Sequence, residues 1–568
     1  MKRFLFLCFL VCSMLGTSLA QQPAIPLPSK PQLRWQKYEQ TMFLCLDPCT
    51  WQGREYDNHS YPISKINPSL LDTDQWCRVA KSYGAGLILF VAKHTGGFCW
   101  WQTETTDYSV KSTPWRNGKG DVLKDLSESC KKYGLGLGVY VYAGDEQWGA
   151  GIGSGGRTKD PSKQEAYNKV YRQQLTEVLT NYGPVQEVWF DGSCVIDVHD
   201  ILEKYASDAV IFGGKQASIR WVGNEDGVAP DPNWYTLDKE VLVKGANAMH
   251  SDVYGNAYAP VEVDVPLQNN KGHKWFWAPK CEHLVMSLEQ LMTTYYNSVG
   301  RGSVLLLDAS PDTTGLIPPY HVKRYEEFGR EIKNRFDKPL ARTSGHKTAF
   351  CLSFKKPTVV NHCIIQEKLE KGQRITSYVI EGKDEAGNWK LLSKGQSVGN
   401  KKIDYFKNIT VKQLRLRVLS CKDKPYVRNF AAYNVKSKVG DVQAINKLER
   451  PKVVSAWQPV NYSEDEWKEL EIDLTPYVTE VGQYDLSFNI LTSDYWGKGN
   501  PGLSFKDWTI EMYGRPFPEG IKKLDGKDVF RIIRSQQTLD EFPTKFKVKV
   551  KRNPRKSSGE ITIHRIKF

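Results

Sequence analysis

The sequence predicts a multidomain protein of the α/β plus all-β class, with a (β/α)8-like barrel followed by two β-sandwich-type domains. Two observations predict this fold class. From about Leu33 to Phe336, short apolar runs alternate with longer stretches of helical periodicity. From about Ala341 onward the helical periodicity disappears, and β-rich runs are divided by turn residues. The expected segments are a signal peptide over 1–20, the barrel over 21–338, a β-sandwich over 339–437 and a β-rich domain over 438–568.

The N-terminal segment has the pattern of an export signal. Two basic residues precede an apolar run, and Ser18, Leu19 and Ala20 form the small-x-small pattern that signal peptidase cuts. We therefore expect the mature chain to begin near Gln21 and to be periplasmic or extracellular. Because no later apolar run reaches membrane-spanning length, we expect no transmembrane segment after the leader.

The barrel region contains continuous apolar runs that are typical of buried parallel strands. Between them lie stretches such as residues 164–182, whose apolar positions recur at helical spacing. A doubly wound sheet is the alternative, but GIGSGG at 151–156 lacks the helix-opening pattern of a phosphate-binding loop. A barrel places its chemistry at the C-terminal ends of the strands. The five runs are GLILFVA (86–92), GLGVYVYA (136–143), EVWFDG (187–192), AVIFGG (209–214) and SVLLLDA (303–309).

The second half of the chain has the pattern of antiparallel sheets. TSYVIEGKD (376–384), WKLLSKG (389–395) and KQLRLRVLS (412–420) are short β-like runs with turn residues between them. In the last region KFKVKVKR (545–552) alternates strictly, which predicts a strand with one lysine-bearing face.

Composition excludes some classes of protein. The 78 Lys and Arg against 64 Asp and Glu give a net charge of +14 spread over 568 residues, so we predict no nucleic-acid partner. Aromatic residues make up 12% of the chain, with 17 Trp and 28 Tyr. That content exceeds the demands of core packing, and flat amphipathic rings recur at sugar-binding surfaces.

The cysteines predict neither a disulfide scaffold nor a zinc site. Ten of the twelve follow the leader, and none of them forms a CxxC pair. The C-x3-C spacing of Cys45 and Cys49 would allow a bridge in an oxidising compartment, but buried free thiols are the favoured interpretation. The sequence implies no metal and no organic cofactor.

Carboxylates at expected strand ends are the strongest chemical signal. Asp191 closes an apolar run beside Trp189, although an Asp at such a junction also caps helices or starts turns. Glu225 follows Arg220 and Trp221 in one expected loop, and Glu262 precedes an aromatic cluster at 275–277. Two carboxylates among aromatic rings fit glycoside hydrolysis, in which one attacks the sugar and the other handles the leaving-group proton.

Five ordered motifs resemble the α-L-fucosidases of glycoside hydrolase family 29, closest to the branch that prefers α-1,3/1,4-linked fucose. The resemblance covers about residues 35–335 and implies a retaining exo-α-L-fucosidase on a (β/α)8-like barrel, acting on a fucosylated oligosaccharide or glycoconjugate. The motifs are VAKHTGGFCWWQTETTDYSV (91–110), NYGPVQEVWFDG (181–192), RWVGNEDGVA (220–229), PVEVDVPL with GHKWFWAP (260–267, 272–279) and SVGRGSVLLLDASPDTTGLIP (298–318).

The resemblance also implies residue roles. Asp191 is the expected nucleophile and Glu225 the expected acid/base, with Glu262 as the rival for the second role. Arg220 is expected beside Asp191, where its charge would keep the carboxylate ionised. The expected substrate-binding residues are His94, Tyr140, Trp189, Arg220, Trp221, Glu55 and Glu262. For two of them a structural role is the alternative, namely core packing for Trp221 and a satisfied buried imidazole for His94.

The chain departs from the family pattern at two positions that usually hold sugar-binding histidines. Cys45 stands where many members have the His of FIHFG, and Thr95 stands at the second His of KHHDGF. The glycone could therefore be a related sugar such as L-galactose, and a fucose-binding, lectin-like protein with a degraded barrel is the non-enzymatic alternative. Residues 339–437, through CIIQEKLEKGQRITSYVIEG (363–382) and the runs that follow it, additionally resemble the discoidin (factor 5/8 type C) β-sandwich. Such modules bind carbohydrate or brace the catalytic barrel, and we expect bracing because no cluster of exposed aromatic residues marks a sugar site.

Overall fold

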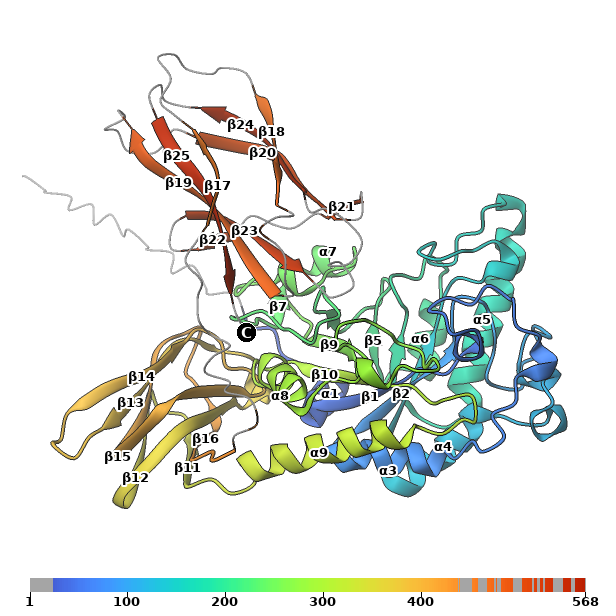
Figure 1. The fold of residues 1–568 in the computed structure, drawn as a ribbon, viewed down its shortest axis with the longest axis horizontal. Helices are drawn as coiled ribbons and strands as arrows, with labels where there is room; N and C mark the ends of the chain where they lie inside the picture. Colours follow the sequence, from blue (N-terminus) through green and yellow to red (C-terminus); the bar gives the residue numbers. More distant parts are fainter. Residues whose placement is uncertain are drawn as a thin grey trace, which may run out of the picture.

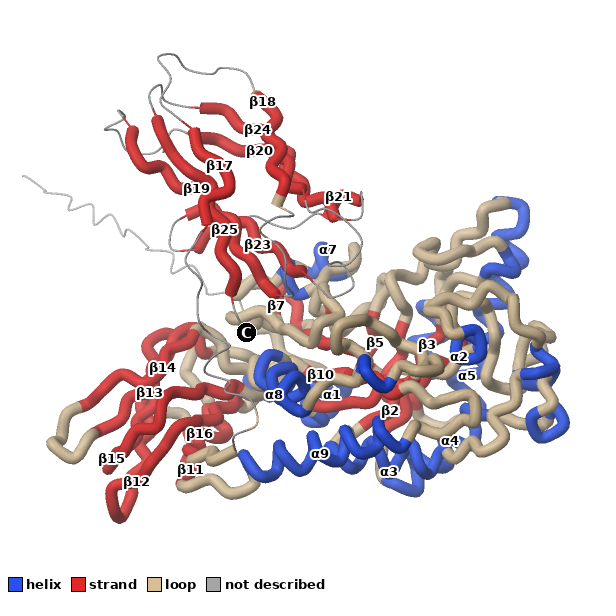
Figure 2. Tube along the Cα trace, viewed as in Figure 1, coloured by secondary structure: helices blue, strands red, loops and turns tan. Residues whose placement is uncertain are grey.

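The computed structural model describes residues 24–437, Val439 and, beyond them, separate segments between 452 and 566 that are mostly strands (Figures 1 and 2). The expected signal peptide over 1–20 lies outside the described residues.

An eight-stranded parallel sheet forms the first part of the chain and curls into a nearly closed barrel. Neighbouring strands follow the order β5-β4-β3-β2-β1-β10-β9-β6, and every pairing within the sheet is parallel. A single parallel bridge, Phe212 to Ile219, joins the two ends at the seam. This agrees with the predicted (β/α)8-like barrel. The strands are β1 (Gln40–Leu44), β2 (Leu87–Lys93), β3 (Gly136–Val141), β4 (Val185–Trp189), β5 (Val210–Phe212), β6 (Arg220–Trp221), β9 (Val261–Pro266) and β10 (Val304–Ala309).

Helices cover most of the barrel, with β5 and β6 joined directly by the short segment 213–219. Aspartates at the N-caps of α3 and α4 accept hydrogen bonds from the first turn, and glycines with positive φ close both helices. In Figure 1, α3 and α9 run side by side along one flank of the barrel. The helices are α1 (Lys30–Tyr38), α2 (Pro48–Gln52), α3 (Thr73–Tyr83), α4 (Val122–Tyr133), α5 (Gln164–Asn181), α6 (His199–Tyr205), α7 (Lys239–Leu242), α8 (Leu288–Asn297) and α9 (Pro319–Phe336); a two-stranded ribbon, β7 (Thr236–Leu237) and β8 (Ala257–Tyr258), lies between β6 and β9.

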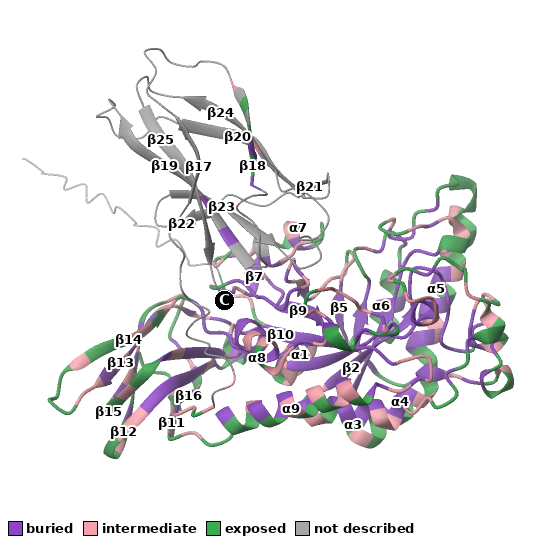
Figure 3. Cartoon of the chain, viewed as in Figure 1, coloured by how far each residue is buried: buried purple, intermediate pink, exposed green. Residues whose placement is uncertain are grey.

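The core runs through the barrel wall and the ring of helices, as the buried colouring of Figure 3 shows. Every residue of β1, β2, β3 and β10 is buried, which explains why β2, β3 and β10 are apolar at consecutive positions, rather than alternating, until Lys93 and Asp308 near their C-terminal ends.

A six-stranded antiparallel sheet follows the barrel. Its order is β11-β16-β12-β15-β13-β14, and it has its own apolar core. The strands are β11 (Ala341–Gly345), β12 (Ala349–Glu367), β13 (Ile375–Lys383), β14 (Trp389–Gly395), β15 (Lys402–Cys421) and β16 (Val427–Tyr433).

Polar contacts fasten this antiparallel sheet to the barrel region. Lys402 pairs with Asp231 at 2.6 Å, and the Asn400 amide donates to the carbonyl of Gln36 at 2.7 Å. Gln373 exchanges hydrogen bonds with the backbone of the loop that precedes β7. These contacts join residues far apart in sequence, so the sheet and the barrel support each other.

The C-terminal segments form two further antiparallel sheets, ordered β17-β25-β19-β23-β22 and β18-β24-β20-β21. The prediction of a β-rich region is met, and KFKVKVKR is a strand; the domain boundaries themselves remain predictions. The strands are β17 (Lys452–Trp457), β18 (Lys468–Asp473), β19 (Gly482–Ser493), β20 (Leu503–Met512), β21 (Arg515–Phe517), β22 (Lys522–Leu524), β23 (Lys527–Arg534), β24 (Lys545–Arg552) and β25 (Ser557–Ile566).

Among the described residues, no helix combines the length and the hydropathy that crossing a membrane requires.

Candidate active site

A cavity of about 620 Å³ opens at the C-terminal ends of the barrel strands. This is the end at which (β/α)8 barrels carry their chemistry. Its walls combine aromatic rings with four carboxylic acids and two histidines. The aromatic lining residues are Phe43, Tyr56, Tyr140, Trp189, Phe212, Trp221, Trp275 and Phe276; the acids are Glu55, Asp191, Glu225 and Asp264; the histidines are His94 and His273.

Asp191 presents its carboxylate to this cavity just after β4 ends. The backbone turns at Gly192, whose φ of +72° favours glycine, and Asp191 therefore leaves the sheet. The hydroxyl of Tyr140 donates to Oδ2 at 3.0 Å. Burial raises the pKa of Asp191 to about 6, while the Tyr140 hydrogen bond lowers it and the charge of Glu225 raises it further. The side chain caps no helix, since α6 begins only at His199.

Glu225 is held on the loop after β6. An Asx turn shapes that loop, because the Asn224 side chain accepts from the Asp226 amide and donates to the carbonyl of Val228. Oε2 of Glu225 lies 2.8 Å from Nε2 of His273 and accepts a 3.3 Å hydrogen bond from the Trp275 indole. The carboxylate is therefore fixed at the cavity wall while remaining partly open to it.

Glu55 and Asp264 complete the acidic lining. Glu55 accepts from the backbone amide of Trp275 at 3.0 Å and pairs with Lys274 at 3.6 Å, and burial raises its pKa. Asp264 accepts from the Trp221 indole at 2.7 Å. Burial, followed by the charge of Glu225, raises the pKa of Asp264 well above its ordinary range.

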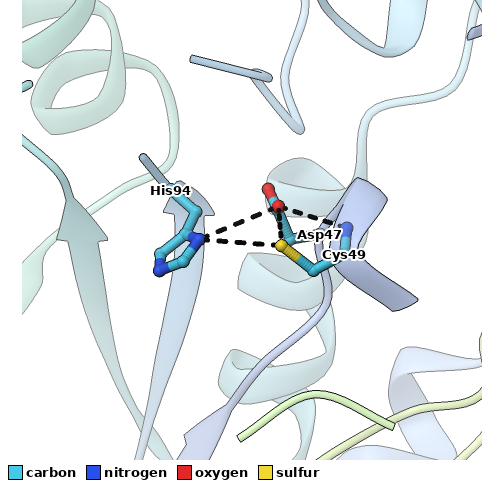
Figure 4. Close-up of side chains that lie close together, drawn as sticks. All are labelled: Asp47, Cys49 and His94. Carbon is cyan, nitrogen blue, oxygen red and sulfur yellow. Dashed lines mark hydrogen bonds and ion pairs between the residues drawn. The ribbon is translucent and has the colours of Figure 1, made fainter. Parts of the chain in front are cut away.

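His94 lies in the cavity wall as a neutral imidazole. Its ring is stacked on Tyr56 with an interplanar angle of 6° and lies 5.0 Å from the ring of Phe276. Burial lowers the pKa of His94 to about 4, so the ring is uncharged at neutral pH. Nδ1 faces away from the stacked rings toward Asp47 and Cys49 (Figure 4).

Trp189 belongs to an aromatic wall. It stacks on Phe212 with ring centroids 3.9 Å apart and on Tyr140 at 5.4 Å. Phe43 packs against both Tyr140 and Trp189 with its ring tilted by 41° and 45°. Such faces suit the apolar side of a sugar ring.

Arg220 does not line the cavity, which corrects the expectation that it lies beside Asp191. Its side chain is buried, and its guanidinium donates to the carbonyls of Ala259, Trp234 and Asn247. Burial lowers the pKa of Arg220 to about 9. The guanidinium thus ties together the loops behind β6, and it is Tyr140 that contacts Asp191.

Glu262 also lies outside the cavity, which corrects its placement as a substrate-binding residue and as a rival acid/base. It is buried inside the barrel, where Oε2 accepts from the Trp189 indole at 2.8 Å and the carboxyl hydrogen-bonds Glu187. Burial raises the pKa of both carboxyls, and the charge of Glu187 raises that of Glu262 further.

The two positions that depart from the family histidines behave differently. Cys45 lines the cavity, and its thiol hydrogen-bonds the buried carboxyl of Asp308. Thr95 is buried beside His94, with Oγ1 3.4 Å from Nδ1, and does not reach the cavity. Cys45 and Cys49 are buried free thiols, which agrees with the interpretation favoured over a disulfide.

Several lining residues escaped the sequence analysis, among them Tyr56, Asp264 and His273. Asp264 had a visible signal, because it follows Glu262 by two residues in a strand and so shares its face. His273 precedes the aromatic cluster in the quoted GHKWFWAP, but a lone histidine carries little information. Nothing local marks Tyr56.

Comparisons with known proteins point in one direction. The family model described as Alpha-L-fucosidase matches residues 32–335. Alpha-L-fucosidase 1 of Arabidopsis thaliana is 32% identical over 465 residues, which covers 72% of this chain and 88% of that protein. A crystal structure from Bacteroides thetaiotaomicron superposes with a TM-score of 0.68 at 35% identity, covering 72% of this chain and all of that one. A Ruminococcus gnavus fucosidase solved with fucose gives a TM-score of 0.65 at 25% identity, covering 74% and 98% of the two chains.

Proposed function

Since the chain belongs to the α-L-fucosidase family and is a glycoside hydrolase, we propose that it is a retaining exo-α-L-fucosidase that releases α-1,3/1,4-linked fucose from glycans. The observation that carries the proposal is the placement of Asp191 and Glu225 in one aromatic-lined cavity at the strand ends. An acid pair in such a setting is what double displacement at a glycosidic carbon requires.

Asp191 is the nucleophile in this mechanism. Its carboxylate attacks C1 of the sugar while the C1–O bond to the aglycone breaks, and a glycosyl ester forms on the enzyme. With a pKa of about 6, most Asp191 is ionised at neutral pH, as attack requires. The Tyr140 hydroxyl stabilises the charged form and orients Oδ2.

Glu225 is the acid/base. It gives its proton to the departing glycosidic oxygen, and its carboxylate then takes a proton from the water that attacks C1 and releases Asp191. Its contacts with His273 and Trp275 leave the side chain anchored through Oε2, so the proton transfer falls to a fixed carboxyl.

The cavity supports a substrate larger than one monosaccharide. Its volume of about 620 Å³ lies in the range of sites for drug-sized ligands. Small residues at Gly213, Gly214 and Ala217 widen the wall beyond Trp189 and Phe212. An extended or branched aglycone therefore has room to contact the protein and to contribute binding energy at the reacting sugar.

L-Galactose is the second candidate glycone. It differs from fucose by a hydroxyl on C6, and the observation that favours it is Cys45, whose small side chain stands in the cavity wall where many family members carry a histidine. Sugar binding without turnover is the remaining alternative.

One experiment separates these possibilities. The purified full-length protein is assayed for kcat/KM on an aryl α-L-fucoside, an aryl α-L-galactoside and a branched Lewis-type oligosaccharide. NMR of the first-formed product determines the anomeric outcome. We expect the highest kcat/KM on the branched fucoside, with retention. A higher value on the galactoside would reassign the glycone, net inversion would refute double displacement, and binding without turnover of all three would refute the enzymatic function.

We further propose that the enzyme acts outside the cytoplasm and that the discoidin-like sheet over 339–437 braces the barrel. The leader pattern supports the first statement, and the contacts of Asn400, Gln373 and Lys402 support the second. Recovery of the protein from the periplasm or medium with Gln21 near its N-terminus tests the location. Loss of thermal stability in Lys402→Ala tests the brace, since it leaves Asp231 without this partner.

A further inference from the structure

Three side chains with different ligand atoms converge behind the sugar-facing wall of the cavity. His94 follows the end of β2, Asp47 caps the N-terminus of α2, and Cys49 lies in the first turn of that helix (Figure 4). All three are buried. His94 belongs to the cavity lining, whereas Asp47 and Cys49 lie in the layer behind it. The group therefore adjoins the cavity without being used by the hydrolytic mechanism.

The three ligand atoms are nearly as far apart as zinc would hold them. Sγ of Cys49 lies 2.9 Å from Oδ2 of Asp47 and 3.9 Å from Nδ1 of His94, and Nδ1 lies 3.8 Å from Oδ2. With Zn–S of about 2.3 Å and Zn–N and Zn–O of about 2.0–2.2 Å in tetrahedral geometry, ligand atoms are roughly 3.3–3.6 Å apart. Shifts of about half an ångström at each pair bring the observed triangle to that size.

The charge around the group also suits a cation. Oδ1 of Asp47 is buried and has no hydrogen-bond partner within the described chain. None of the ion pairs among the described residues joins Asp47 to a lysine or arginine, and the charge of Asp57 raises the pKa of Asp47 rather than stabilising its carboxylate. A buried carboxyl without a positive partner is costly, and a bound cation removes that cost.

The donor set selects the kind of cation. A thiolate, an imidazole and a carboxylate together are typical of zinc, whereas calcium and magnesium take oxygen ligands. Neutral His94 can bind zinc through Nδ1 in the tautomer that carries the ring proton on Nε2, so His94 releases no proton on binding. On binding, the Cys49 thiol releases its proton to solvent, and so does the Asp47 carboxyl, whose pKa burial raises to about 8. The S–H···O bond to Asp47 breaks, and S–Zn and O–Zn bonds form.

We propose that Asp47, Cys49 and His94 bind one zinc ion behind the cavity wall, with a water molecule from the cavity side as the fourth ligand. The ion anchors the ring of His94 from behind and leaves its stacked face against Tyr56 unchanged. This proposal does not rest on the fucosidase assignment, because a metal site is detected without substrate.

Zinc binding to the full-length, tag-free protein tests the proposal. After chelator treatment and desalting, the protein is titrated with zinc chloride in competition with a chromophoric chelator, and bound metal is counted by elemental analysis. We expect one zinc ion per chain with a Kd in the micromolar range or below, and a rise of Tm with zinc concentration. Cobalt(II) in place of zinc should give the thiolate-to-cobalt charge-transfer absorption and the visible bands of a tetrahedral site.

Matched variants identify the ligands. Cys49→Ser should weaken zinc affinity by about tenfold or more and abolish the charge-transfer absorption. Asp47→Asn should also weaken binding, and asparagine preserves the cap of α2, so the fold is retained. Cys351→Ser is the control, because it removes an exposed thiol outside the group.

Two results would overturn the proposal. One is the absence of saturable zinc binding to the wild-type protein. The other is a zinc affinity and cobalt spectrum that persist in Cys49→Ser but disappear in Cys351→Ser, which would place the metal on the surface. If Cys49→Ser fails to fold, the affinity of Asp47→Asn and the wild-type cobalt spectrum decide the matter.

Discussion

The hydrogen bond from Tyr140 to Asp191 makes a quantitative prediction about the pH dependence of catalysis. Tyr140→Phe removes the hydroxyl that donates to Oδ2 at 3.0 Å and keeps the ring that stacks on Trp189. Because the lost bond stabilises only the ionised carboxylate, the pKa of Asp191 should rise above its wild-type value of about 6.

The size of the shift follows from the bond and its surroundings. A hydrogen bond to a charged group contributes about 1.5–3 kcal/mol. Protein atoms surround Asp191 closely enough to raise its pKa, but its side chain still faces the solvent-filled cavity, so the lower end of this range applies. About 1.5 kcal/mol corresponds to about one pKa unit. The ionised fraction at pH 6 then falls from about one half to about one tenth, whereas at pH 8 it falls by only about a tenth.

The assay is kcat/KM against pH, from pH 4.5 to 9, on the best substrate of the panel. In this quantity the acidic limb reports the ionisation of the free enzyme's nucleophile. We expect the limb to move up by about one unit, with an approximately fivefold loss at pH 6 and little loss at pH 8. Tyr142→Phe is the matched control, because the Tyr142 hydroxyl accepts from the Gly153 amide and makes no bond to Asp191. A loss of equal size at every pH would refute the reasoning and make Tyr140 a substrate contact instead.

Four further predictions concern Asp191, Glu225 compared with Glu262, His273, and Cys45 with Thr95. Asp191→Asn should abolish turnover but retain sugar binding. Because the pKa of Asp191 is raised in the folded state, its charge destabilises the folded protein increasingly as pH rises from about 4 through about 6. The variant should therefore have a higher Tm than wild type at pH 8 and nearly the same Tm at pH 4, and an equal gain at both pH values would contradict the assignment. Glu225→Ala should recover turnover of an activated substrate with azide and give a glycosyl azide. Glu262→Gln should keep most activity, because Glu262 lies inside the barrel against the Trp189 indole and outside the cavity. Azide rescue at position 262 in place of 225 would exchange their roles. His273→Gln should lower kcat more than it raises KM, because His273 contacts the proposed acid/base and holds it in position. A rise in KM with unchanged kcat would make His273 a substrate-binding residue instead. Cys45→His, alone and with Thr95→His, should raise kcat/KM on the aryl fucoside relative to the branched substrate. Cys45 is buried against Asp308, so a larger side chain there can overpack the site. A loss of kcat/KM on all substrates would show that the space is already filled.

The sequence predicted most of the barrel strands and the carboxylate that follows β4. Continuous apolar runs identified β2, β3, β4, β5 and β10, because a parallel strand covered on both faces has no polar side to interrupt it. The strand-end position of Asp191 indicated that it faces the cavity, whereas Tyr140 and Trp189 were assigned there by the family resemblance. The two-residue strand β6 carries too little pattern to be seen, and its register against β9 decides which side chains face the cavity.

The two misplaced residues lie on paired strands, and the family resemblance had assigned both of them to the substrate site. Arg220 and Trp221 are consecutive in β6 and face opposite sides, so only Trp221 lines the cavity. Glu262 shares a face of β9 with Asp264, but it lies two residues farther from the C-terminal end of the strand, inside the barrel, where it contacts Trp189 and Glu187. The Arg220 guanidinium donates hydrogen bonds to three backbone carbonyls from separate loops. A local sequence motif does not reveal such acceptors.

The seam of the barrel is a natural place to change what the enzyme accepts. Only one bridge joins Phe212 to Ile219, and the short connection 213–219 contributes Gly213, Gly214 and Ala217 to the cavity wall. Neither proposed catalytic carboxylate lies in that segment. A longer loop grafted there would meet the aglycone while leaving the strands that hold Asp191 untouched. An insertion in this one connection would therefore change the contacts to the substrate without moving the proposed catalytic carboxylates.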